Sequence, residues 1–263
     1  MEPLFLLPST TSHKHEPLLP TLELFSKLGM CDLDLNLNHI IERGESPEAV
    51  QAALHANGQH VWIVSGGWCD FFDTAPKLRS TFASVERQVA LAIQFGVDRL
   101  RLFFGRLPID DFDARALATI AANLRRLADA HPALLFVLEN HDGASSRPDV
   151  CRRILESVDR RNVRLNFDPI NFEHAGVSAM DALHELQPLV RHVHLKGLDR
   201  GRFCEFGEGD VDLQPVLRTL IAGGYRGAFT VEYEGAFDRT LHLTLGVQNA
   251  RQVLDGLLER KYT

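Results

Sequence analysis

Short apolar runs alternate along the chain with longer segments in which apolar residues recur every three or four positions. Most of the runs are continuously hydrophobic, which is typical of strands buried on both faces of a parallel sheet. Eight runs are predicted as strands: residues 4–7, 31–37, 61–65, 100–105, 134–140, 163–168, 191–196 and 228–234.

The segments between the runs have the spacing of amphipathic helices. The clearest stripe, at i, i+3, i+4, i+7 and i+8, consists of Leu213, Val216, Leu217, Leu220 and Ile221. Similar stripes over 85–93 and 117–127 predict two more helices, and Asp110 and Asp111 precede the second of them, where acidic residues favour a helix N-terminus.

Eight strand–helix units in 263 residues match the size of a (β/α)8 barrel, so we expect one TIM barrel domain over residues 1–263. An open doubly wound sheet shares the alternation. However, no G-x-G-x-x-G or G-x-x-x-x-G-K-[ST] motif follows any of the runs.

Composition narrows the functional class. The net charge of −7 disfavours non-specific binding of nucleic acid. The four cysteines form no C-x-x-C pair and are interpreted as reduced thiols, and no stretch is apolar enough for a signal peptide or a membrane span. We therefore expect a soluble cytoplasmic protein with no membrane or nucleic-acid partner.

Four consecutive predicted strands end in a carboxylate or an imidazole: Glu139, Asp168, His194 and Glu232. In a barrel these ends meet at the face that carries the active site. Three carboxylates held in partial burial require a neutralising cation or proton. With one imidazole they suit a single divalent ion such as Mn²⁺, Mg²⁺ or Co²⁺, with Zn²⁺ as an alternative.

The motifs around these positions resemble the xylose-isomerase-like barrels, the sugar isomerase/epimerase superfamily that includes endonuclease IV. The matching pieces are L-E-N-H at 138–141, F-D-P-I-N at 167–171, H-V-H-L-K-G at 192–197, G-E-G-D-V-D at 207–212 and G-Y-R-G-A-F-T-V-E-Y at 224–233. The resemblance implies that the four residues are metal ligands. It also implies that Glu139 and Glu232 form an acid/base pair on either side of a metal-stabilised enediolate.

Further residues are candidates for contact with substrate. These are His141, Asn171, Lys196, Arg200, where the epimerases carry a substrate-handling arginine, and Trp68, as an apolar wall for a sugar ring. Two positions depart from the family pattern, since Asn171 stands where the epimerases often have histidine and Gly197 where many relatives have aspartate. His192 is interpreted as a hydrogen-bonded core residue, and His13 and His15 as parts of a solvated loop.

The sequence thus predicts a metal-dependent isomerase or epimerase acting on a sugar or sugar phosphate. A lyase of the inosose or 3-dehydroshikimate dehydratase type is the alternative on the same barrel, because the same enolate could expel a β-hydroxyl. A non-catalytic sugar-binding barrel is a third hypothesis. An abasic-site endonuclease is the weakest, since residues 206–212 contain no histidine for further metal ligands. The expected partner is a small sugar or keto-polyol, and the outer helices of a barrel also allow a homo-oligomer, whose size the sequence leaves open.

Overall fold

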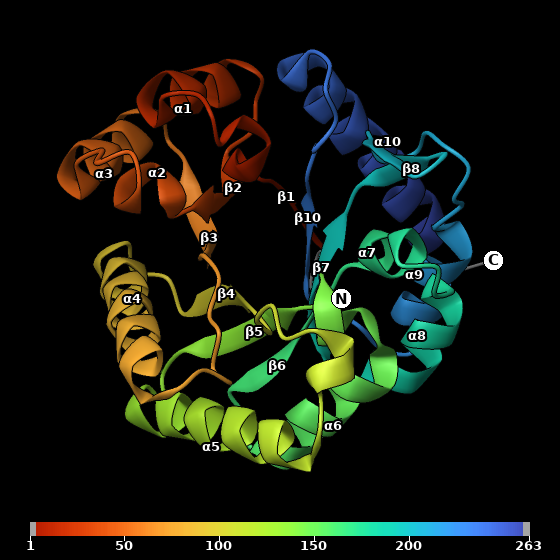
Figure 1. Ribbon diagram of the computed structural model, residues 1–263. Helices are drawn as coiled ribbons and strands as arrows, with labels where there is room; N and C mark the ends of the chain where they lie inside the picture. The colour runs from red at the N-terminus through yellow and green to blue at the C-terminus, as the bar shows by residue number, and fades with distance from the viewer. Residues whose placement is uncertain (1–3, 260–263) are drawn as a thin grey trace. The chain divides into compact units, whose positions relative to one another are not determined.

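The computed structural model describes residues 4–259, and its elements alternate as the sequence predicts (Figure 1). The parallel sheet contains β1 (Phe5–Pro8), β2 (Asp32–Asn36), β3 (His60–Ser65), β4 (Arg99–Phe103), β5 (Leu135–Glu139), β6 (Val163–Phe167), β7 (Val190–Leu195) and β10 (Ala228–Val231). Its strand order is β1-β10-β7-β6-β5-β4-β3-β2. All eight predicted strands are confirmed, and the fold is a (β/α)8 TIM barrel.

At least one helix follows each of these strands before the next begins. The helices are η1 (Thr10–His13), α1 (Leu18–Lys27), α2 (Asn38–Ile41), α3 (Pro47–Ala56), α4 (Ala75–Gln94), η2 (Ile109–Asp111), α5 (Ala114–Ala130), η3 (Gly143–Ser146), α6 (Pro148–Val158), α7 (Pro169–His174), α8 (Ala179–Leu186), η4 (Gln187–Leu189), α9 (Gln214–Ala222) and α10 (Arg239–Glu259). Within the described residues, no helix is both long and apolar enough to cross a membrane.

The contacts between residues divide the chain into two compact units. The terminal unit contains the chain up to Trp62 and from His192 onward, and the central unit contains Ile63–Arg191. In the terminal unit β1 pairs in parallel with β10, and β10 pairs with β7. A parallel bridge from Ser9 to Asp34 joins the end of β1 to β2. Leu7, Leu33, Leu35 and Phe229 are fully buried.

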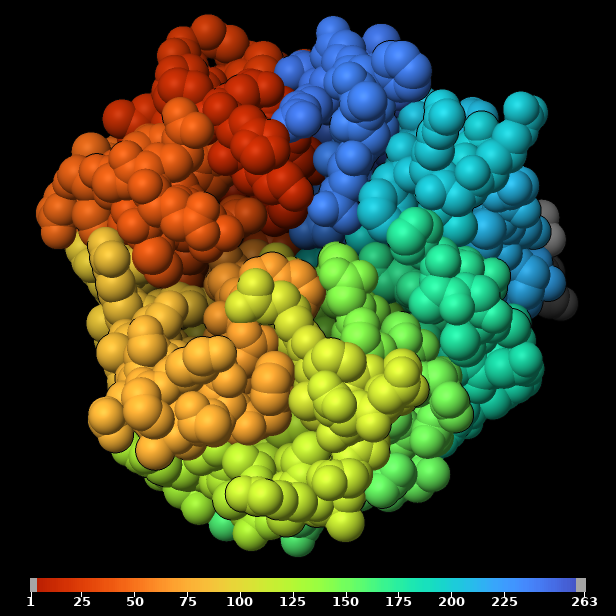
Figure 2. All heavy atoms as spheres, viewed as in Figure 1, coloured from red at the N-terminus to blue at the C-terminus, as the bar shows by residue number. Residues whose placement is uncertain are grey.

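In the central unit β4 pairs with β3 on one side and with β5 on the other, and β5 pairs with β6. Helices α4, α5 and α6 lie along one face of these strands (Figure 1). The segments that follow β3 and β4 lie side by side on the surface (Figure 2), and the backbone N–H of Arg106 donates to Asp70 at 2.8 Å.

Two local details differ from the sequence prediction. Asp110 and Asp111 form the short helix η2, and the residue that caps α5 is Asp113, whose carboxylate accepts from the N–H of Ala116 at 2.7 Å. After β7 the chain forms an unpredicted antiparallel hairpin of β8 (Gly197–Asp199) and β9 (Arg202–Cys204). Its strands are three residues long, too short to give a detectable alternation.

Candidate metal centre

The central unit contributes Glu139 and Asp168. Glu139 is the last residue of β5 and Asp168 directly follows β6, and both are buried. Asn140 fixes their spacing, because its side chain donates to the Asp168 carbonyl at 2.8 Å and accepts from the Asp168 N–H at 2.9 Å. Asp168 is also the N-cap of α7, since its Oδ1 accepts from the N–H of Asn171 at 3.0 Å.

Two further side chains hold the carboxylate of Glu139. The amide Nδ2 of Asn171 donates to Oε1 at 3.3 Å, and the guanidinium Nε of Arg101 lies 3.1 Å from Oε2. Arg101, on β4, is 3% exposed and also donates to the carbonyl of Gly66 at 2.9 Å. Sequence reasoning missed Arg101, although a charge between Leu100 and Leu102 in a buried strand was the available signal.

The terminal unit contributes His194 and Glu232. His194, on β7, is fully buried, and Glu232 directly follows β10 with 3% of its surface exposed. The parallel register places Thr230 beside His194, and His194 Nδ1 lies 3.4 Å from Oε2 of Glu232. The other oxygen of Glu232, Oε1, is buried without a hydrogen-bond partner among the described residues.

The electrostatics of Glu232 reflect this pairing. Burial alone would raise the pKa of its carboxyl group, but the adjacent His194, through its charge and a hydrogen bond, lowers that pKa to about 2. A buried carboxylate stays ionised where neighbouring charges or hydrogen bonds compensate for the lost water, and a metal ion at this position would do the same.

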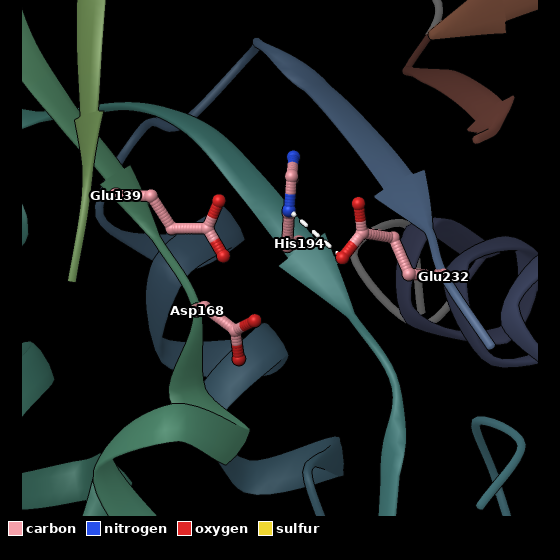
Figure 3. A group of neighbouring side chains, drawn as sticks. All are labelled: Glu139, Asp168, His194 and Glu232. Carbon is pink, nitrogen blue, oxygen red and sulfur yellow. Dashed lines mark ion pairs between the residues drawn. The ribbon is translucent and has the colours of Figure 1, made fainter. Parts of the chain in front are cut away.

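Glu139, Asp168, His194 and Glu232 each offer one ligand atom, and these four atoms all lie within 4.8 Å of one another (Figure 3). Three carboxylates and one imidazole are the donor set of a hard to borderline divalent ion. Four buried donors of this kind, gathered closely enough to surround one ion, fit a metal. The group could therefore hold one divalent ion, as the sequence predicts.

Two candidate substrate residues of the central unit, Trp68 and His141, belong to an aromatic cluster. Trp68 stacks on Phe103 with ring centroids 4.1 Å apart, and both rings meet the edge of His141, at 5.2 and 5.4 Å. Nδ1 of His141 faces Asp142 at 3.1 Å. Trp68 and His141 thus lie in contact, and His141 follows Glu139 by two residues along the chain.

The candidates of the terminal unit occupy different environments. Lys196 is 1% exposed, and its ammonium group donates to Glu234 at 2.7 Å. Arg200 instead lies in the turn of the β8–β9 hairpin, with 89% of its side chain exposed and its guanidinium 3.8 Å from Asp199. The structure therefore places Arg200 outside the buried group, because the hairpin carries it away from the end of β7.

Histidines in the terminal unit test two other predictions. His192 is buried and its Nε2 lies 2.8 Å from the Thr230 hydroxyl, as expected for a hydrogen-bonded core residue. His13 is fully buried, so its assignment to a solvated loop is wrong, while His15 is exposed. The polar segment around His13 is buried because it forms the helix η1, which packs against Phe25.

Gly197 has a steric explanation. A Cβ atom at this position would lie 2.7 Å from the Cys204 sulfur and 2.8 Å from the Glu208 carbonyl oxygen. A larger side chain, aspartate included, therefore does not fit here unless the β8–β9 hairpin shifts.

Comparison with known proteins agrees with this architecture. The model of the xylose isomerase-like TIM barrel family matches residues 30–257, and the chain belongs to that family. The match extends well before the motifs of the C-terminal half, so the predicted family is confirmed.

Several curated relatives are dehydratases. An inosose dehydratase of Clostridium perfringens is 25% identical over 153 residues, which are 51% of each chain. A 3-dehydroshikimate dehydratase of Bacillus anthracis is 24% identical over 132 residues, covering 49% of this chain and 47% of the relative. The chain thus spans about half the length of the curated relatives it matches.

Solved structures share the fold at lower identity. An L-ribulose 3-epimerase superposes with a TM-score of 0.83 at 13% identity, covering 98% of this chain and 96% of the other. The IOLI protein with a bound zinc atom superposes with a TM-score of 0.80 at 16% identity, covering all of both chains. At these identities the likeness establishes the fold.

Proposed function

We propose that the protein is a metal-dependent dehydratase that removes water from a cyclic hydroxy-ketone. The observation that carries the proposal is the buried group of Glu139, Asp168, His194 and Glu232. A divalent ion held there would bind the substrate carbonyl and stabilise the enolate that forms when the neighbouring C–H loses its proton.

Glu232 is the residue that would take this proton. Its Oε2 faces His194, whereas its Oε1 is buried and has no hydrogen-bond partner in the described part of the chain. An ionised carboxylate oxygen with a free lone pair can accept a proton from a substrate carbon that binds next to it, as a general base must.

The two contacts on Glu139 favour dehydration over epimerisation. An epimerase needs a second group that returns the proton on the opposite face. The Arg101 guanidinium lies 3.1 Å from one oxygen of Glu139 and Asn171 donates to the other, so both contacts are made to the ionised carboxylate and not to a carboxylic acid that could return a proton. We therefore assign Glu139 to metal binding, and to Glu232 alone the role of base.

Elimination also needs a proton donor for the departing hydroxyl group. His141 is the candidate in the central unit, because Asp142 orients its ring and Trp68 and Phe103 pack against it. The same aromatic rings offer a flat apolar surface to a six-membered ring. The curated relatives support this class, because inosose and 3-dehydroshikimate are both cyclic hydroxy-ketones.

The test is to incubate the Mn²⁺-loaded protein with these two compounds in D2O. Loss of water is followed by mass spectrometry and by the ultraviolet absorbance of the conjugated product, and C–H exchange by NMR. Glu232→Gln should abolish both loss of water and exchange. Glu86→Gln, a change on the outer helix α4, should leave both intact. Exchange or epimerisation without loss of water would refute the dehydratase assignment.

A further inference from the structure

Asn166 is a buried amide to which the proposed chemistry gives no role. It lies on β6 between Leu165 and Phe167, and it is 0% exposed. Neither its Oδ1 nor its Nδ2 has a hydrogen-bond partner among the described residues. A buried donor or acceptor that is left unpaired has lost its hydrogen bonds to water without compensation, so this side chain requires an explanation.

Strand geometry places Asn166 beside the two candidate metal ligands of the central unit. In the parallel pairing of β5 with β6, Asn166 is the register partner of Glu139. Asn166 also precedes Asp168 by two residues of extended backbone, and side chains two residues apart point to the same face of a strand. Figure 3 shows the side chains of Glu139 and Asp168 directed into the same space. The amide of Asn166 therefore points to the side on which the metal would be held.

The other amides next to these ligands form their hydrogen bonds within the protein. Asn140 uses both of its amide atoms on the backbone of Asp168, at 2.8 and 2.9 Å. The Nδ2 of Asn171 donates to the Glu139 carboxylate at 3.3 Å and to the Asn140 carbonyl at 3.0 Å. These two side chains hold the ligands in place, whereas Asn166 has no such bond in the described part of the chain. A buried polar group of this kind is typical of a position that binds something other than protein.

We infer that Asn166 is a substrate-binding residue that recognises a hydroxyl group next to the carbonyl of the substrate. An amide has one acceptor and two donors. Its Oδ1 can accept from a hydroxyl group while its Nδ2 donates to the oxygen on the adjacent carbon. A substrate whose carbonyl binds beside Glu139 would present these two oxygens to Asn166. The inference rests on the proposed function and narrows its substrate to ketones that carry a hydroxyl group on the neighbouring carbon.

The decisive variant is Asn166→Leu, which keeps the branched shape of the side chain and removes both polar atoms. We expect this variant to bind substrate about 10- to 100-fold more weakly, the loss of two hydrogen bonds. Its urea midpoint without metal should equal or exceed that of the parent protein, because an apolar group replaces an unpaired polar one. Weaker binding without a loss of stability separates a substrate-binding role from a structural one.

Asn162→Leu is the matched control, just before the start of β6. The amide of Asn162 donates to the carbonyls of Ala128 and His131 at 3.0 and 3.2 Å. Its replacement leaves these carbonyls without their donor, so it should lower the urea midpoint and leave the affinity for substrate unchanged.

Calorimetric titration of the Mn²⁺-loaded proteins with inosose and with 3-dehydroshikimate gives the affinities. Glu232→Gln serves as the background, because the proposed mechanism makes it inactive and binding is then measured without turnover. Titration of the metal-free proteins with Mn²⁺ should give the same affinity with and without Asn166→Leu, since Asn166 is not a ligand. If Asn166→Leu does not fold, Asn166→Ala, which is too small to clash, should show the same loss of substrate affinity.

Each outcome decides a different point. An unchanged affinity for both compounds in Asn166→Leu would overturn the inference and show that Asn166 binds a structural water only. A urea midpoint as low as that of Asn162→Leu would also overturn it, since the amide would then stabilise the protein. If Asn166→Leu weakens binding but the parent protein removes no water from either compound, the dehydratase assignment fails and the role of Asn166 stands. A protein that binds neither compound would overturn both.

Discussion

The positive charge of Arg101 compensates the negative charge of Glu139. Replacing Arg101 allows the contribution of this ion pair to stability to be measured. The two side chains are 4% and 3% exposed, and the atoms of the ion pair are 3.1 Å apart. At an effective dielectric constant of about 20, unit charges at this distance attract by roughly 5 kcal/mol. Leaving one partner of a buried pair alone costs about 3–5 kcal/mol. We therefore expect Arg101→Met to lower the free energy of unfolding of the metal-free protein by about 3–5 kcal/mol.

The assay is urea unfolding in the presence of a chelator, followed by circular dichroism. A double-mutant cycle with Glu139→Gln isolates the pair, because the contacts of Arg101 with Gly66 cancel in it. The double variant leaves neither charge unpaired, so its loss should be at least about 2 kcal/mol smaller than the sum of the single losses. Mn²⁺ should stabilise Arg101→Met more than the parent protein, since the ion supplies the missing positive charge.

Arg106→Met provides the comparison for an exposed pair. Arg106 lies 2.6 Å from Asp70 but is 59% exposed, so its replacement should cost only about 0–1 kcal/mol. Additive losses in the Arg101 and Glu139 cycle would refute the reasoning, as would equal losses for Arg101→Met and Arg106→Met.

The remaining predictions concern the metal, a buried histidine and a tight turn. Chelation should lower the melting temperature of the protein. Mn²⁺ at 100 times its dissociation constant should raise the free energy of unfolding by about 2.7 kcal/mol. A calorimetric melting temperature that does not change with chelator or Mn²⁺ would contradict the metal site. Burial lowers the pKa of His39 below 6.5, so stability should fall as pH drops through 6.5, where the unfolded chain gains a proton that the folded chain does not. His39→Gln should flatten this slope in urea titrations at pH 8 and pH 5, and an unchanged slope would exclude His39 as its source. Gly143→Ala should lower the free energy of unfolding by about 2–4 kcal/mol, because φ is +62° at this residue and the new Cβ would meet the backbone of Leu107. Gly44→Ala, at φ +74° with open space around it, should cost only about 1 kcal/mol, and equal costs would show that the steric contact is unimportant.

The strands and the four candidate ligands were predictable because each carries a local signal. A buried parallel strand must be continuously apolar, and a carboxylate or imidazole at its end is conspicuous by contrast. Glu139, Asp168, His194 and Glu232 follow such runs one strand after another, so each was found independently of the others.

The supporting residues lack a signal of this kind. Asp34 is one of two aspartates in β2, and only the fold shows that it faces His194 while Asp32 faces Trp62. His13 lies in a run of serine and threonine that suggests solvent, yet η1 buries it against Phe25. These roles depend on residues far away in sequence, which no local pattern specifies.

The pairing of β1 with β10 has a consequence for how the protein is made. β1 is synthesised first and β10 last, and the register from Phe5 with Ala228 to Pro8 with Val231 forms only after the central unit has been translated. Until then the edge of β1 that β10 will cover is unpaired, and Ser9 lacks the Val231 carbonyl that anchors it. An unpaired apolar edge can pair with other chains, and long-range parallel pairing forms slowly. The edge of β1 thus stays open to other chains until β10 has emerged, and the hydrogen bond that anchors Ser9 to Val231 can form only then.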